Sequence, residues 1–170
     1  MSERPDGTEA SEYYFTYINQ VGSGDIRELL ADQLRETLSL LDGIADGRSR
    51  YRYAPGKWSI RESVSHVNDA ERVFTYRAFW FARKFDTPLP SFDQDVAAAS
   101  SDADARSLKS HRDEFAAIRG ASLELFRNLP DVAWTRCGVA SGNPFTVRAL
   151  AYITAGHVAH HNRILRERYL

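Results

Sequence analysis

Apolar side chains recur every three or four positions along most of the chain, with polar side chains between them. This period matches the α-helix, in which such positions share one face. Leu30, Leu34, Leu38 and Leu41, for example, form one apolar stripe. Several alternating apolar and polar runs, which would indicate a sheet, are absent. The pattern predicts four long helices, at roughly residues 25–44, 59–84, 102 or 104 to 128, and 146–168.

Capping and turn residues support these boundaries. Asp25 and Ser59 are of the types that cap helix N-termini, and Glu62 follows Ser59 by three positions, as in a capping box. Pro55 and Gly56 mark a loop before the second helix, and the two prolines of DTPLPSFDQD mark another after it. Four helices of about 20 residues with long connections predict an all-α fold, a four-helix bundle.

Composition places the chain among ordinary globular proteins. Its 170 residues are 43% hydrophobic, which predicts a single domain over residues 1–170 with a sizeable core. The polar start, residues 1–12, is expected to be flexible, and the aromatic run at residues 13–17 is expected to pack onto the body. No secretory signal and no membrane-spanning segment is expected.

Charge and cysteine content exclude several kinds of function. The net charge of −1 gives no electrostatic basis for binding nucleic acid. The single cysteine, Cys137, excludes an internal disulfide and a cysteine-cluster metal site. A reducing, cytoplasmic compartment fits this cysteine content.

The most specific chemical signal is a pair of histidines in the last predicted helix. His157 and His161 are four residues apart, so they lie one turn apart on the apolar stripe that includes Leu150 and Ile153. Both imidazoles could reach one metal ion at about 2.0–2.1 Å. His160 points about 100° away from this pair. The alternative is that inward-facing histidines are satisfied by hydrogen bonds and bind nothing.

A metal site of this kind needs a third ligand from elsewhere. His111 lies among charged residues in LKSHRDEF and is expected to be exposed. His66 lies in the first half of the second predicted helix beside apolar Val67, so it is the better candidate. Three histidines with an open position are typical of a catalytic metal site. The glutamate of the HEXXH zinc-protease motif is missing, which argues against a protease of that kind.

Two further polar residues allow two interpretations each. Asp69 follows His66 by three positions and could orient an imidazole, or it could form a surface ion pair with Arg72. His160 could assist as a proton shuttle or serve as an alternative ligand. It could also be a polar residue between helices, and its direction favours this last interpretation.

The segments APGKWSIRESVSHVNDAERVFTYRAFWFAR and LAYITAGHVAHHNRILRERYL resemble the DinB-like superfamily of damage-inducible proteins. The most specific parts of the resemblance are Lys57-Trp58-Ser59, the His-x-x-Asp at residues 66–69 and the terminal His-x3-His. The resemblance covers roughly residues 12–170 and implies a four-helix bundle that carries a divalent metal on three histidines. Carried over by position, these ligands are His66, His157 and His161.

The resemblance also implies a range of functions. One is a metal-dependent hydrolase, and another is a transferase or isomerase that uses a low-molecular-weight thiol, in each case with a small-molecule substrate. Zn²⁺ and Ni²⁺ are the expected metals, although histidine ligands also suit copper and iron. The alternatives are a metal-binding or small-molecule-binding module without turnover in a stress response, and a structural bundle. A homodimer is expected. The aromatic segment VFTYRAFWFARKF could supply its interface, and the alternative is that these residues only fill the core.

Overall fold

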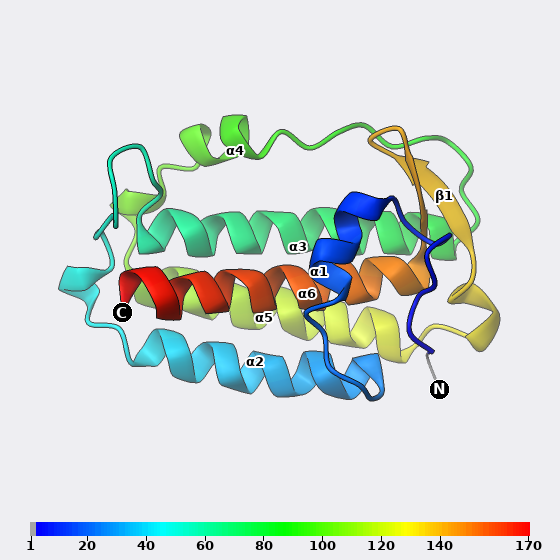
Figure 1. Ribbon diagram of the computed structural model, residues 1–170, viewed down its shortest axis with the longest axis horizontal. Coiled ribbons are helices and arrows are strands. Elements are labelled where there is room, and N and C mark those ends of the chain that lie inside the picture. The colour runs from blue at the N-terminus through cyan, green and yellow to red at the C-terminus, as the bar shows by residue number, and fades with distance from the viewer. Residues whose placement is uncertain (1–2) are drawn as a thin grey trace.

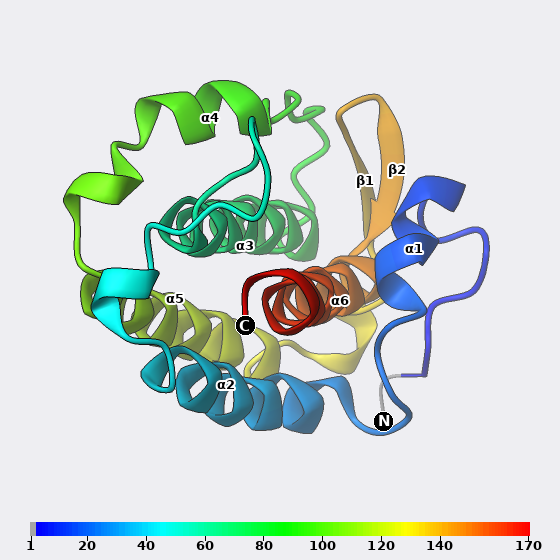
Figure 2. The same ribbon diagram turned by 60° about the vertical axis from the view of Figure 1, so that its left-hand side comes forward.

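The computed structural model describes residues 3–170, and residues 1 and 2 lie outside the described part. Four long helices form a bundle in which each of them packs against two others, as Figures 1 and 2 show. The bundle helices are α2 (Ile26–Asp42), α3 (Ile60–Ala82), α5 (Leu108–Arg127) and α6 (Val147–Ile164). The all-α four-helix bundle predicted from the sequence is therefore confirmed.

Shorter elements connect and cover the bundle. A π-helical turn at Leu165–Tyr169 continues α6. The other elements are α1 (Phe15–Ile18), α4 (Gln94–Ser100), strands β1 (Cys137–Ala140) and β2 (Asn143–Thr146), and 3₁₀ turns at Glu12–Tyr14, Asp46–Arg48, Ala103–Ala105 and Asp131–Ala133. No helix of the described residues is both long enough and apolar enough to cross a membrane.

Side-chain caps fix where the bundle helices begin. The Ser59 hydroxyl accepts a hydrogen bond from the Glu62 backbone N–H at 3.1 Å, and the Glu62 carboxylate accepts one from the Ser59 N–H at 2.7 Å, so the predicted capping box is present. Asp25 caps α2, as predicted, and Thr146 caps α6. These caps satisfy backbone donors that the first turn of a helix otherwise leaves without partners.

Two predictions for residues 86–108 were wrong. The third bundle helix begins at Leu108, where Ser107 caps it, and not near Asp102 or Asp104. Asp102 adopts a left-handed conformation with φ 47°, and Asp104 lies in a separate 3₁₀ turn. Part of the segment predicted as a loop forms α4, which Asp93 caps by accepting two backbone hydrogen bonds. This short helix packs over α3.

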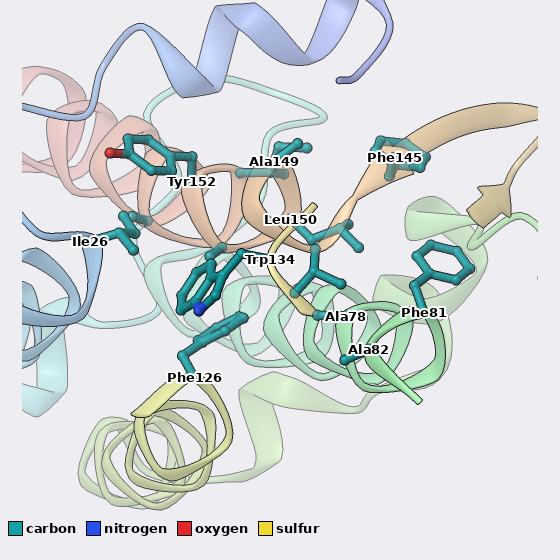
Figure 3. Close-up of a cluster of buried hydrophobic side chains, with 14 of the residues drawn as sticks. Ile26, Ala78, Phe81, Ala82, Phe126, Trp134, Phe145, Ala149, Leu150 and Tyr152 are labelled. Atoms are coloured by element: carbon teal, nitrogen blue, oxygen red, sulfur yellow. The ribbon is translucent and has the colours of Figure 1, made fainter. Parts of the chain in front are cut away.

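Helix α6 packs against two bundle helices, α2 and α3, and is also covered by α1 (Figure 2). Residues 147–158 place apolar side chains on nearly every face of α6, as expected of a helix that is buried all round. Figure 3 shows Leu150 of α6 in a cluster that includes the rings of Phe126 and Trp134. These two rings stack with centroids 5.9 Å apart.

A buried ion pair joins three bundle helices. Arg119 on α5 is fully buried, and its guanidinium donates to both oxygens of Glu71 on α3 at 2.7 and 2.9 Å. It also donates to the Leu30 carbonyl and to Gln33 on α2. A planar guanidinium suits this arrangement, because its fixed donors match a carboxylate in two places.

The connection between α5 and α6 contains a two-stranded antiparallel hairpin, β1–β2, in which Cys137 is paired with Thr146. The sequence pattern predicted no sheet. Ser141 and Gly142 form its turn with φ angles of 53° and 73°. Cys137 is exposed at the start of β1.

Two residues of the N-terminal segment, Arg4 and Glu9, are hydrogen-bonded to the body, whereas the flexibility expected for residues 1–12 stays a prediction. Arg4 donates to the carbonyls of Ile18 and Val21, and Glu9 accepts hydrogen bonds from Thr146 and Arg148. The aromatic run forms α1, which packs against α6, as expected for residues 13–17.

Candidate metal centre

Helices α3 and α6 run antiparallel and make the most extensive helix–helix contact of the bundle (Figure 1). Their antiparallel packing sets the first half of α3 beside the second half of α6. His66 on α3 therefore lies opposite His157 and His161 on α6, and we call these three residues the histidine triad.

The three imidazoles of the histidine triad form a nearly equilateral triangle. Their ring centroids are 4.9 Å (His66–His157), 5.0 Å (His66–His161) and 4.6 Å (His157–His161) apart. Each ring offers one nitrogen, and these three nitrogens all lie within 4.8 Å of one another. The Nε2 atoms of His66 and His157 are 3.1 Å apart.

These distances fit a metal ion. Nitrogens at about 2.05 Å from a tetrahedral ion lie about 3.3 Å apart, so the 3.1 Å pair is close to that value and small side-chain rotations would bring the third nitrogen in. No other histidine, cysteine or carboxylate among residues 3–170 joins this group. Three protein ligands would leave at least one coordination position open, as in catalytic sites.

The protonation state of the histidine triad also suits a metal. Burial lowers the pKa of His66 to about 4 and lowers the pKa of His157 and of His161 well below the usual value for histidine. The neighbouring imidazoles lower the last two further, because charges of the same sign repel. The rings are therefore neutral near pH 7, which is the form that binds metal ions.

Aromatic rings enclose the histidine triad. Trp58 lies 4.7 Å from His66, while Tyr17 and Phe74 lie 5.3 and 5.6 Å from His157, measured between ring centroids. The Ser63 hydroxyl lies 3.4 Å from Nδ1 of His161, so this serine can fix the orientation of the ring. Sequence reasoning missed Ser63, because its contact with His161 crosses from α3 to α6 and its position one turn before His66 carries no recognisable signal.

The other predicted site residues lie outside the triad. The Asp69 carboxylate accepts from Arg72 at 3.2 Å, and none of the described imidazoles donates to it, so its contacts match the surface ion pair. His160 is not one of the three grouped ligands, but its ring packs edge-to-face on Tyr17 and on His161, with centroids 5.5 and 5.2 Å apart. Its position matches that of a polar residue between helices.

The prediction that His111 is exposed was wrong. Its side chain is fully buried beneath the Ala103–Ala105 turn, and its Nε2 lies 2.9 Å from the Ala103 carbonyl oxygen. The charged neighbours in the sequence face outward on α5, whereas His111 occupies the inward position of that turn. His111 lies outside the histidine triad, as expected.

Two pockets flank the histidine triad. The first, which we call the Arg77 pocket, has a volume of about 210 Å³ and is lined by His66 and His157 together with Arg77 and several aromatic side chains. The second, the Asp95 pocket, has a volume of about 300 Å³ and is lined by His161, Ser63 and Asp95. Members of the histidine triad thus line two separate pockets.

Asp95 is a second site residue that sequence reasoning missed. It lies on α4, in the segment predicted as a loop, and its negative charge acts on His66 in the direction that raises the pKa. Asp95 is the only acidic residue that lines the second pocket among the described residues.

Comparisons with known proteins agree with the fold. YfiT from Bacillus subtilis, described as a probable metal-dependent hydrolase with an unusual four-helix bundle topology, superposes with a TM-score of 0.71 at 18% sequence identity. The match covers 98% of this chain and 91% of YfiT. No curated protein matches the sequence significantly. The sequence model of the DinB superfamily matches residues 29–165, most of the chain, and confirms the resemblance noted above. The chain therefore belongs to the DinB superfamily.

Proposed function

We propose that the histidine triad binds one divalent metal ion, Zn²⁺ or Ni²⁺, and that the protein is a metal-dependent enzyme acting on a small molecule. The observation that carries this proposal is the convergence of three neutral, largely buried imidazole rings between two pockets. The description of YfiT as a probable metal-dependent hydrolase supports hydrolysis as the reaction. Transfer of a low-molecular-weight thiol is the second form of the same chemistry.

The metal would supply the nucleophile. When bound, a divalent ion lowers the pKa of a water molecule or a thiol at its open position, so that a nucleophile is available at neutral pH. Hydrolysis would use the water molecule, and thiol transfer would use the thiol. The two reactions therefore share one metal site and differ in the group bound beside it.

The residues around the triad have separate roles in this proposal. Trp58, Tyr17 and Phe74 exclude water from the imidazoles, which strengthens electrostatic interactions at the site. Ser63 holds the His161 ring in position. Asp95 takes up the proton that the water molecule or thiol loses.

Elemental analysis of protein purified without a histidine tag tests the metal site. We expect about one metal ion per chain in the wild type, and loss of that ion in His157→Ala and in His161→Ala. The matched control is His160→Ala, which removes a histidine from the same helix but outside the triad and should keep the metal. Metal-free wild-type protein whose melting temperature does not respond to added Zn²⁺ or Ni²⁺ would contradict the proposal.

Turnover separates an enzyme from a metal-binding protein without activity. The metal-loaded wild type should hydrolyse members of a panel of small esters and amides, or should conjugate small electrophiles when a thiol is added. Activity that depends on the added thiol indicates the transferase, and activity without it indicates the hydrolase. His157→Ala should be inactive in both assays, whereas retained activity in this variant would exclude the triad as the reaction centre.

A further inference from the structure

Three arginine side chains are buried in the described part of the chain, and one of them differs from the other two. Arg119 is paired with Glu71, and Arg61 donates to Asp46 at 2.8 Å. Arg77 on α3 is only 4% exposed, yet no carboxylate of residues 3–170 lies within 4.0 Å of its guanidinium. A buried cation without a counterion is costly, so its occurrence calls for an explanation.

The protein partners of Arg77 are neutral groups. Its Nη2 donates to the Pro90 carbonyl at 3.0 Å and to the Ser141 hydroxyl at 2.9 Å, and the Tyr14 hydroxyl lies nearby. Burial lowers the pKa of Arg77, but an arginine keeps its charge at neutral pH. A guanidinium has five N–H donors. Pro90 and Ser141 accept from two of them, both on Nη2, and the Tyr14 hydroxyl is a third hydrogen-bond partner, so donors still remain on Nε and Nη1 for another acceptor.

Arg77 lines the same pocket as two members of the histidine triad. The Arg77 pocket extends from His66 and His157 to Arg77 and Ser141, so one small molecule can contact both ends. Its walls carry aromatic rings from α1 and its flanking turn, from α3 and from the segment before α4. These rings belong to Tyr13, Tyr14, Tyr17, Phe74 and Phe92.

We infer that the Arg77 pocket binds the carboxylate of a small, flat substrate, with the guanidinium of Arg77 as the anion-binding group and the histidine triad facing the rest of the molecule. This inference rests on the proposed function for the role of the triad, but it assigns a binding site and a substrate class that the proposed function leaves open. Arg77 is a binding residue in this scheme, and the reacting atoms lie at the other end of the pocket.

The shape and charge of the pocket favour a carboxylate over a phosphate. The single positive charge of Arg77 matches the single negative charge of a carboxylate, which can accept a charge-assisted hydrogen bond from Nε or Nη1. A phosphate monoester carries nearly two negative charges at pH 7 and three acceptor oxygens, and Arg77 is the only charged side chain that lines this pocket among the described residues. The volume of about 210 Å³ is smaller than that of pockets for drug-sized ligands, and the aromatic walls suit a flat body.

Ligand-observed NMR titration with benzoate, benzamide and phenyl phosphate tests the inference. The protein is used both as purified and after metal removal with a chelator, because binding to the metal-free form cannot come from a bound ion. We expect benzoate to bind both forms, and to bind at least about tenfold more tightly than benzamide, which has the same shape without the charge. Equal binding of benzoate and benzamide, or tighter binding of phenyl phosphate, would overturn the inference.

Substitutions then locate the site. Arg77→Gln should weaken benzoate binding at least about tenfold and leave benzamide binding unchanged. Arg72→Gln is the matched control, because Arg72 lies on the same helix but is half exposed, pairs with Asp69 and Glu114, and does not line the Arg77 pocket. Unchanged benzoate binding in folded Arg77→Gln would refute the assignment. If that variant does not fold, the comparison of benzoate with benzamide in the wild type still decides the matter.

The two proposals fail in distinguishable ways. If benzoate binding depends on Arg77 but the protein takes up no metal, the carboxylate site is supported and the proposed metal-dependent activity is refuted. If the protein binds metal but does not prefer benzoate over benzamide, only the inference of a carboxylate site is refuted.

Discussion

Gly156 lets α1 approach the histidine triad, and Gly156→Ala tests how much this close approach contributes. Gly156 is in the buried interior of α6, one residue before His157. A Cβ atom at this position would lie 2.1 Å from the Tyr17 carbonyl oxygen and 2.4 Å from its carbonyl carbon. The obstacle is backbone, not the end of a flexible side chain, so α1 must move away.

The structure allows the size and sign of the change in the free energy of unfolding caused by Gly156→Ala to be worked out. Ordinary contact begins at 3.4 Å, so the Tyr17 backbone must retreat by more than about 1 Å. Overpacking of this kind costs about 1–3 kcal/mol, whereas alanine gains up to about 1 kcal/mol over glycine within a helix. We therefore expect Gly156→Ala to lower the free energy of unfolding by about 1–2 kcal/mol, and the melting temperature by about 2–8 °C.

The same substitution elsewhere provides the control. Gly120 lies in the interior of α5, and a Cβ atom added there would have no other atom within 4 Å, so Gly120→Ala should raise the free energy of unfolding by about 0.5–1 kcal/mol. Thermal and urea unfolding of both variants measure whether the free energy of unfolding changes in opposite directions. If Gly156→Ala stabilised the protein as much as Gly120→Ala does, the packing of α1 on α6 described above would be refuted.

Two further predictions concern buried charge. Glu71→Ala leaves Arg119 buried without a counterion and should lower the free energy of unfolding by about 3–5 kcal/mol, whereas Asp32→Ala, which breaks an exposed ion pair with Arg35, should change it by less than about 1 kcal/mol. Urea unfolding measures both, and equal losses would contradict the role of the buried pair. Metal-free protein should lose stability as the pH falls from 6.5 to about 4, because the folded-state pKa of His66 is lowered and the unfolded chain binds more protons in that range. His66→Gln should make this pH dependence shallower, and an unchanged slope would contradict the pKa shift.

The sequence predicts the bundle well because its helices carry their signals locally. The stripe of leucines in α2 and the capping box of Ser59 and Glu62 are readable without the fold. The α4 region lacked such a signal, because Asp93 caps a short helix in a segment bounded by prolines. The burial of His111 was equally hidden, since its sequence neighbours are charged and its burial depends on the turn that covers it.

The residues of the candidate site divide in the same way. His157 and His161 could be identified by their spacing, and His66 by its apolar neighbour and by the resemblance to the DinB-like proteins. Asp95 and Arg77 could not be found, because their significance depends on what lies opposite them in space. An arginine in a helix is ordinary in a sequence, and only its burial without a carboxylate partner sets Arg77 apart. The homodimer stays a prediction.

The central position of α6 has a consequence for how the protein is made. Because α6 follows the other three bundle helices in the chain, a ribosome synthesises their apolar faces before the helix that covers them exists. His66 likewise emerges 91 residues before His157. Nascent chains that lack α6 are therefore expected to remain open and prone to association, and to need chaperones. The candidate metal centre can form only when the final helix has docked, so metal uptake would report the completion of folding.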